Sequence, residues 1–220
     1  FLFFLILIVV SVSENNRRIA RNTLLLYGRK AVTMLIALYS SRVLLQYLGI
    51  DDFGLYGLVG SIILVFTSLK STFAASVQRF LNVNKEESIA RKNEIFCMGM
   101  IIHVLIAVVF ILLAEIGGAI LLPNLNLNSE KLIVAGCILH FTIFSAAVSI
   151  ITVPFDALAM ANEKFDALAV ISIIDSVLRL CVIFILSFSP IQRVVFYAIL
   201  LLCVTIVHIL MIGGYCYKTF

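Results

Sequence analysis

The 220 residues are 63% apolar and 13% charged, with a mean hydropathy of +1.17 and a formal net charge of +4. A soluble domain is about 45–50% apolar and about 25% charged, so this composition excludes a water-soluble enzyme or nucleic-acid-binding domain. The apolar residues occur in blocks of about 20, the length that crosses about 30 Å of hydrocarbon as a helix. The sequence therefore predicts an all-α, polytopic integral membrane protein without a nucleic-acid partner.

Residues 1–13 form an apolar extension of uncertain role. They are too few to span a bilayer, and they end in small residues that resemble a signal-cleavage site. Cleavage there would place Arg17, Arg18 and Arg21 outside, whereas the positive-inside rule favours a cytoplasmic location for them. We therefore interpret residues 14–220 as the folded unit.

Six membrane-spanning helices are predicted within this unit. They lie near residues 31–48, 55–77, 95–114, 132–153, 167–188 and 194–214. The expected connections are a tight turn at 49–54, a charged loop at 82–93, an Asn-rich loop at 122–131, an amphipathic helix at 154–166 and a turn at 187–193. An even number of spans places both termini on the same side.

Basic residues are concentrated in alternate connections, which indicates the orientation. With the N-terminus inside, eleven of them lie on the cytoplasmic side: Arg17, Arg18, Arg21, Arg29, Lys30, Arg79, Lys85, Arg91, Lys92, Lys164 and Lys218. Three lie on the outer side: Arg42, Lys131 and Arg193. We expect both termini to be cytoplasmic.

Two charged sites lie well inside predicted spans, where a charge costs about 2.5–3.5 kcal/mol unless it has a partner or faces a cavity. Asp175 and Arg179 are four residues apart with opposite sign, which favours an ion pair on one helix face. Lys70 has no acid within four residues. It is expected to pair with Asp175 across the bundle, to meet water in a cavity, or to bind an anionic ligand.

Other polar residues near or within the spans can be explained by a structural role as well as by a functional one. Tyr39, Arg42 and Gln46 share one face near the outer end of the first span, where Arg42 reaches either the headgroups or a cavity. The three histidines, His103, His140 and His208, occur one per span, which favours a bond to a neighbouring backbone carbonyl over a proton relay. The five cysteines form no C-x-x-C pair and are interpreted as inert, buried thiols.

Five short sequences resemble, in order, those of one membrane-protein family. They are residues 16–27 (NRRIARNTLLLY), 41–44 (SRVL), 48–56 (LGIDDFGLY), 78–81 (QRFL) and 153–157 (VPFDA), the last followed by Glu163-Lys164. Together they resemble bacterial polysaccharide or O-antigen flippases of the multidrug/oligosaccharidyl-lipid/polysaccharide exporter superfamily. The likeness covers essentially residues 15–220.

This resemblance implies two six-helix lobes around a central cavity that opens alternately to each side of the bacterial cytoplasmic (inner) membrane. The implied cargo is undecaprenyl-pyrophosphate-linked oligosaccharide for cell-surface polysaccharide such as lipopolysaccharide. The present chain would be the N-terminal lobe, partnered by a C-terminal lobe or a second half. We expect a truncated chain rather than a natural half, since the sequence begins with Phe rather than Met.

The charges themselves favour an anionic cargo. Arg42, Lys70 and Arg179 outnumber Asp175, the one acid placed well inside a predicted span, so a shared cavity would be net positive and would suit a pyrophosphate. Drug-exporting relatives typically carry an acid on the first span, but residues 31–48 contain none. This leaves open whether an H+ or Na+ gradient drives transport, and no other cofactor is expected.

Two alternatives remain beside the flippase: a multidrug or cation antiporter of the same superfamily, and a non-transporting membrane scaffold. A cavity lined by Arg42, Lys70 and Arg179 would favour the flippase. Acids and aromatic rings would favour the antiporter, and a packed bundle without a cavity would favour the scaffold. An enzyme is not expected, because the sequence contains no Ser-His-Asp set, phosphate-binding glycine loop or H-E-x-x-H motif.

Overall fold

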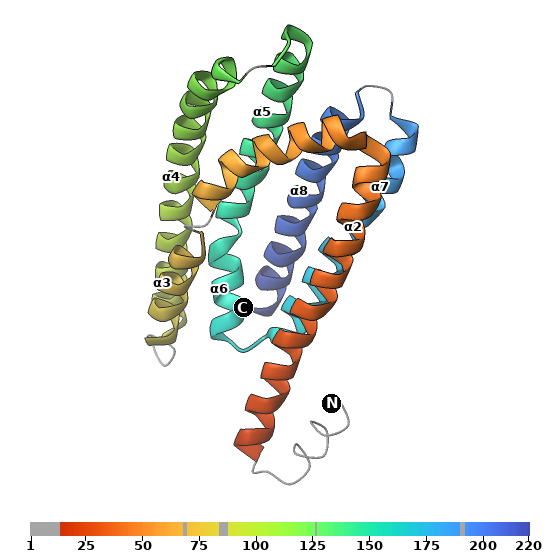
Figure 1. Cartoon of the computed structure of the whole chain (residues 1–220). Helices are drawn as coiled ribbons and strands as arrows, with labels where there is room; N and C mark the ends of the chain where they lie inside the picture. The colour runs from red at the N-terminus through yellow and green to blue at the C-terminus, as the bar shows by residue number, and fades with distance from the viewer. Residues whose placement is uncertain (1–13, 68–69, 84–87, 126, 190–191) are drawn as a thin grey trace.

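The computed structural model describes residues 14–67, 70–83, 88–125, 127–189 and 192–220 (Figure 1). These residues form α-helices, two short 3-10 helices and connecting turns, with no strand among them. Five helical segments are long and apolar enough to cross a membrane. The prediction of an all-α, multi-pass membrane protein is confirmed, whereas residues 1–13 lie outside the described part.

Helix α2 (Glu14–Thr67) contains the first predicted span and the beginning of the second. The predicted turn at 49–54 is reduced to Gly49, whose φ of 79° and ψ of 172° are the non-helical values inside α2. This bend divides α2 into a first arm, residues 14–48, and a second arm, residues 50–67. Figure 1 shows the first arm extending along α7 and the second arm crossing one end of the bundle toward α4.

The predicted span at 55–77 is divided between two helices. The second arm of α2 ends at Thr67, and α3 (Lys70–Val83) begins three residues later, with residues 68 and 69 outside the described part. Fourteen residues of α3 extend roughly 21 Å, too short to cross the hydrocarbon alone. Hydroxyl side chains are frequent in this stretch and compete for backbone hydrogen bonds, which weakens a continuous helix.

The next helices have clear end signals. Ser88 caps α4 (Ile89–Leu121), with its Oγ accepting a bond from the Arg91 amide at 3.3 Å, and η1 (Leu122–Asn124) follows. Asn128 likewise caps α5 (Ser129–Ile151), with a 2.9 Å bond from the Lys131 amide. Side-chain oxygens at these positions satisfy amides that the first helical turn leaves unpaired.

The amphipathic helix predicted at 154–166 is shorter than expected. It is α6 (Val153–Ala161), which follows α5 directly and has Pro154 in its first turn. A turn at 162–164 leads into α7 (Phe165–Ile185), followed by η2 (Leu186–Phe188) and α8 (Arg193–Thr219). The sequence Phe-Asp-Ala-Leu-Ala occurs twice, at residues 155–159 in the middle of α6 and at residues 165–169 at the start of α7.

The helices pack as a single layered bundle. Helix α2 lies against α7, α7 against α8, α8 against α5, α5 against α4, and α3 against α6. The main core consists of small and branched apolar side chains, of which the most deeply buried are Val59, Ala114, Ala135, Ile138, Ile143, Leu186 and Val194. Such side chains permit close helix approach without hydrogen-bonding groups exposed to lipid.

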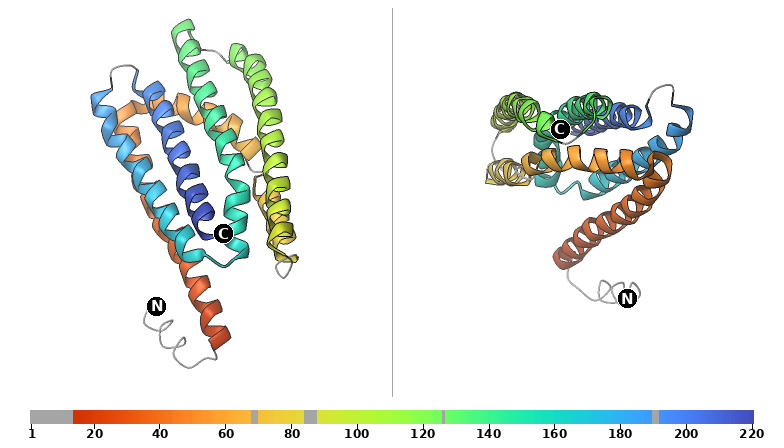
Figure 2. Two further views of the ribbon diagram at one scale, coloured as in Figure 1. Left: turned by 180° about the vertical axis from the view of Figure 1, so that it is seen from behind. Right: turned by 45° about the horizontal axis from the view of Figure 1, so that its top comes forward.

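Successive connections between the helices lie at alternate ends of the bundle, as the sequence predicts. Figures 1 and 2 show the far end of the α2 first arm, the end of α3, the start of α4 and the α6–α7 turn at one end of the molecule. The α2 bend, the adjoining ends of α4 and α5, and those of α7 and α8 lie at the opposite end. The connections rich in Lys and Arg therefore share one end, which we call the basic end.

Gly49 is expected to be indispensable for the bend. Its backbone conformation is essentially restricted to glycine, although a Cβ atom would meet nothing within 4 Å. Gly49→Ala should therefore destabilise the protein by about 1–3 kcal/mol through backbone strain rather than a steric clash. A fall of several degrees in melting temperature in lipid nanodiscs would report it.

The matched control is Gly60→Ala on the second arm, where a Cβ atom also meets nothing within 4 Å but the backbone is helical. Alanine is favoured over glycine in a helix by up to about 1 kcal/mol, so this variant should melt at the same or a higher temperature. Equal losses in the two variants would contradict a special role for the bend.

Candidate functional site

The bend in α2 encloses a cavity of about 370 Å³, which we call the elbow cavity. It is formed by both arms of α2 together with α7 and α8. Its lining is largely apolar and contains Thr33, Ile36, Ala37, Ser40, Ser41, Leu44, Phe53, Tyr56, Gly57, Ser176, Arg179 and Tyr197. A concave, mostly apolar site with a few polar groups is typical of ligand-binding pockets.

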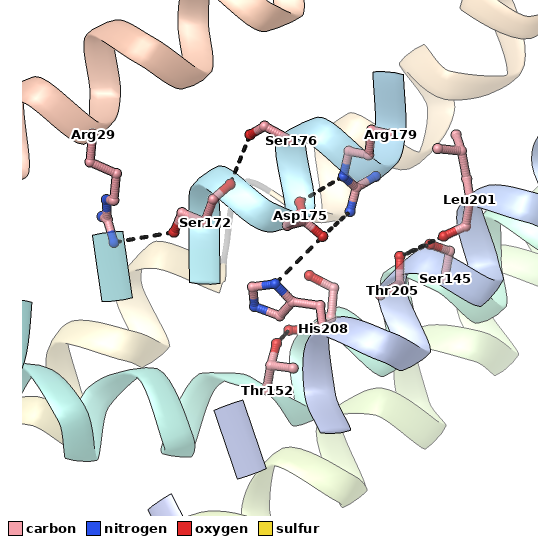
Figure 3. A network of polar contacts seen from close by, with 11 residues as sticks. Arg29, Ser145, Thr152, Ser172, Asp175, Ser176, Arg179, Leu201, Thr205 and His208 are labelled. Carbon is pink, nitrogen blue, oxygen red and sulfur yellow. Dashed lines mark hydrogen bonds and ion pairs between the residues drawn. The ribbon is translucent and has the colours of Figure 1, made fainter. Parts of the chain in front are cut away.

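Arg179 is the one charged side chain in the part of this lining that the structure describes, and the predicted ion pair with Asp175 is confirmed. The Arg179 Nε donates to Asp175 Oδ2 at 2.8 Å, and Nη2 donates to Oδ1 at 3.4 Å (Figure 3). The Arg179 side chain is 40% exposed, whereas that of Asp175 is 16% exposed. Asp175 therefore lies behind Arg179 and fixes the orientation of its guanidinium.

A third ionisable group from α8 joins this pair. His208 Nδ1 lies 3.5 Å from Asp175 Oδ1, and the His208 side chain is 22% exposed. Figure 3 shows Asp175 between Arg179 and His208, which approach it from α7 and α8. One carboxylate is thus shared by two basic side chains, one from its own helix and one from α8.

Aromatic rings form another part of the elbow cavity. Tyr56 of the second arm and Tyr197 of α8 pack edge to face, with ring centroids 5.1 Å apart. Phe53 lies one turn before Tyr56 in the same lining. These contacts join the second arm to α8 and give the cavity an apolar wall with two hydroxyl groups.

The structure does not bring Arg42, the second predicted cation, into this cavity. Arg42 is exposed and is absent from the lining, because it lies about 160–200° around the helix from Ser40 and Leu44, which do line it. Tyr39, Arg42 and Gln46 are all exposed, in agreement with the predicted polar face. Lys70 begins α3, but its side chain lies outside the described part, so its predicted partner is not tested.

The histidines correct the sequence interpretation in two of three cases. His103 does contact a neighbouring carbonyl, with Nδ1 2.8 Å from Gly99 O. His140 instead lies 2.8 Å from a carboxylate oxygen of Glu115 on α4, and His208 approaches Asp175. Both contacts join two helices, which spacing within one span cannot reveal.

Glu115 is the functional-site candidate that sequence reasoning missed. The third span was predicted to end at residue 114, but α4 continues to Leu121, so Asp175 is not the one acid well inside a helix. The apolar residues 119–122, which precede Pro123, are the signal that extends the helix past Gly117 and Gly118. The cysteine interpretation also changes, because all five are free but Cys97, Cys181 and Cys203 are exposed.

No protein-family model, curated protein or solved structure matches this chain. The elbow cavity and the charges around it are therefore the features that bear on function.

The Asp175 carboxylate keeps a second basic neighbour, His208, after loss of Arg179. Arg179→Gln should cost no more than about 1 kcal/mol, because Arg179 is 40% exposed and solvent screens the pair. Arg179→Gln/His208→Ala should cost more than Arg179→Gln, because it leaves the mostly buried carboxylate without either basic neighbour. Melting curves of the two variants would measure the difference.

The double variant Asp175→Asn/Arg179→Gln is the charge-balanced control. It removes both members of the pair and should melt above Asp175→Asn alone, which leaves Arg179 without its carboxylate. Strictly additive losses in the two single variants would contradict an energetic coupling between these side chains.

Proposed function

We propose that this chain forms one lobe of a flippase that moves undecaprenyl-pyrophosphate-linked oligosaccharide across the bacterial cytoplasmic membrane for surface polysaccharide synthesis. The observation that carries the proposal is the elbow cavity, which combines one oriented guanidinium with an otherwise uncharged and largely apolar wall. A lipid-linked pyrophosphate presents the same combination, an anionic group attached to an apolar chain.

The geometry of Arg179 suits a phosphate group. Asp175 uses Nε and Nη2, so that among the described contacts Nη1 is available to a ligand in the cavity. Guanidinium groups bind phosphate oxygens through paired, charge-assisted hydrogen bonds. A guanidinium already held by a carboxylate loses little conformational freedom when the ligand binds, which favours affinity.

The alternatives fit the cavity less well. The rings of Phe53, Tyr56 and Tyr197 would also suit a drug, but no carboxylate is among the described residues of the cavity wall, and Asp175 is engaged by Arg179. A cationic substrate would therefore meet a guanidinium of the same sign. A non-transporting scaffold is expected to fill its interior, whereas this bundle leaves about 370 Å³ at the bend.

A second lobe would cover the polar face of the first arm. Tyr39, Arg42 and Gln46 are exposed on a span where lipid contact with an arginine is costly. A water-filled cavity shared with a C-terminal lobe, or with a second half, would solvate these side chains. Arg42 would then contribute a further positive charge to the path of the anionic cargo.

Binding of an isoprenyl pyrophosphate tests the role of Arg179 directly. In nanodiscs, Arg179→Gln should lower the affinity for farnesyl pyrophosphate about tenfold, because one charge-assisted hydrogen-bond donor is lost. Arg179→Lys should retain part of the affinity, since the charge survives without the planar fork. Equilibrium binding of radiolabelled ligand would measure both.

The control is Lys131→Gln at the outer end, where Lys131 pairs with Asp51 at 3.0 Å and is outside the elbow cavity lining. This variant should bind as the wild type does, and farnesol, which lacks phosphate, should be insensitive to Arg179. Unchanged binding of farnesyl pyrophosphate by Arg179→Gln would remove the cavity from the proposal.

The orientation is tested by cysteine labelling in a variant without the five native cysteines. A membrane-impermeant thiol reagent added to intact bacterial spheroplasts should react with Asn124→Cys but not with Ser88→Cys. Both residues are exposed in the structure, at the α4–α5 and α3–α4 connections respectively. The positive-inside rule gives this result, and the opposite pattern would place the basic end outside.

A further inference from the structure

Helix α8 contacts the backbone of α2 beside the Gly49 bend. Nη1 of Arg193, the first residue of α8, donates to the carbonyl oxygen of Tyr47 at 3.1 Å. Tyr47 lies two residues before Gly49, at the end of the first arm. This bond therefore holds the first arm at the point where the chain changes direction.

Helix electrostatics explain why a guanidinium binds at this point. The carbonyls in the last turn of a helix lack the amide partners that a continuing helix would supply, and they form the negative end of the helix dipole. Tyr47 lies in the last turn before the bend. A cation at the first position of α8 is opposed by the dipole of its own helix, so Arg193 is stabilised by reaching the end of the first arm.

One turn further along α8, Tyr197 contacts the other arm of α2. Its ring packs edge to face on Tyr56 of the second arm, with centroids 5.1 Å apart, and Val194 belongs to the buried main core. Arg193 and Tyr197 are one helical turn, or roughly 6 Å, apart. The first turns of α8 thus contact the first arm on one side of the bend and the second arm on the other.

The elbow cavity depends on these contacts, because its walls belong to the elements that they join. Tyr56 and Tyr197 line the cavity, and so does Leu44, about one turn before Tyr47. Arg193 itself is outside the lining. A displacement of α8 relative to the first arm would therefore change the width of the cavity without removing a group from its wall.

A second cation near the bend provides a comparison. Lys131, in the first turn of α5, binds Asp51 at 3.0 Å, two residues after Gly49. The Lys131 and Asp51 side chains are 42% and 80% exposed, and a pair of flexible, exposed side chains contributes little to holding one geometry. Arg193 instead binds a backbone atom, whose position defines the path of the helix. We therefore expect Arg193, rather than Lys131, to fix the bend.

We infer that Arg193 is a positioning residue, which fixes the angle between the two arms of α2 through the Tyr47 carbonyl and thereby preorganises the elbow cavity. The inference rests on the proposed function for the identity of the ligand, whereas the effect of Arg193 on the bend requires no ligand. A preorganised site binds more tightly, because less conformational freedom is lost on binding. Loss of Arg193 should therefore weaken binding at a cavity that Arg193 does not line.

Pulsed electron paramagnetic resonance measures the bend directly. In the variant without native cysteines, nitroxides at Leu35→Cys and Ser61→Cys lie on the first and second arms, at exposed positions outside the elbow cavity lining. In nanodiscs without ligand, Arg193→Met should widen the distribution of distances between the two nitroxides. Arg193→Lys should restore the narrow distribution, since an ammonium group also donates to a carbonyl. Lys131→Gln is the matched control and should leave the distribution narrow.

Binding of farnesyl pyrophosphate connects the bend to the cavity. Arg193→Met should weaken this binding about fivefold, the effect of one lost hydrogen bond, and Arg193→Lys should recover most of the affinity. The melting temperature of Arg193→Met should change little, because the contact is exposed. A purely stabilising role would instead lower the melting temperature and leave the distance distribution and the affinity unchanged.

Three results would overturn the inference: a distribution as narrow in Arg193→Met as in the wild type, equal widening by Lys131→Gln, or a widened distribution with unchanged affinity for farnesyl pyrophosphate. The distance measurement requires no ligand, so its failure leaves the proposed function standing. Conversely, if Arg179→Gln does not weaken farnesyl pyrophosphate binding, the flippase proposal fails, and a widened distribution in Arg193→Met still supports Arg193 as the residue that fixes the bend.

Discussion

The hydrocarbon of a bilayer offers no hydrogen-bond partner to the peptide backbone, so a spanning chain must satisfy its own amides and carbonyls. Long helices follow from this constraint, and breaks are tolerated where the backbone meets protein or water. The Gly49 bend lies at the same end of the bundle as the adjoining ends of α4 and α5, rather than midway along it. The elbow cavity exists because α2 turns there instead of continuing, and the second arm then crosses α8 and α5 (Figure 1).

The same absence of water explains how the interior charges are arranged. Asp175 is mostly buried and is flanked by Arg179 and His208, so the carboxylate always has a basic neighbour. Glu115 and His140 make the corresponding contact between α4 and α5. Each acid thus has a basic partner within 2.8 Å, which offsets the cost of placing a charge inside a membrane-spanning helix. Interior charges in this protein join helices as well as neutralise each other.

Hydropathy and spacing predicted much of the fold, because both reflect local physics. The apolar blocks located the spans from residue 95 onward, and four-residue spacing was enough to predict the Asp175–Arg179 pair. The division of the 55–77 segment could not be read from hydropathy, since a window average does not register where a helix changes direction. The third span was predicted to end at residue 114, one residue before Glu115, and this acid was therefore not recognised as lying inside a helix.

The site was harder to predict than the fold because it depends on which helices become neighbours. His208 lies 33 residues from Asp175 in the sequence, and no pattern within either helix relates them. Arg42 and Arg179 looked equivalent as cations inside spans, but helical phase directs one into the elbow cavity and the other away from it.

The first arm is long, and its length amplifies the geometry of the bend. Residues 14–48 extend roughly 50 Å as an unbroken helix, beyond the neighbouring helices at the basic end. Asn22 is 27 residues, or roughly 40 Å, from Gly49, so a difference of 5° in the angle of the bend would displace Asn22 by roughly 3.5 Å. The backbone angle at a single glycine near one end of the bundle therefore fixes where the arm ends at the other.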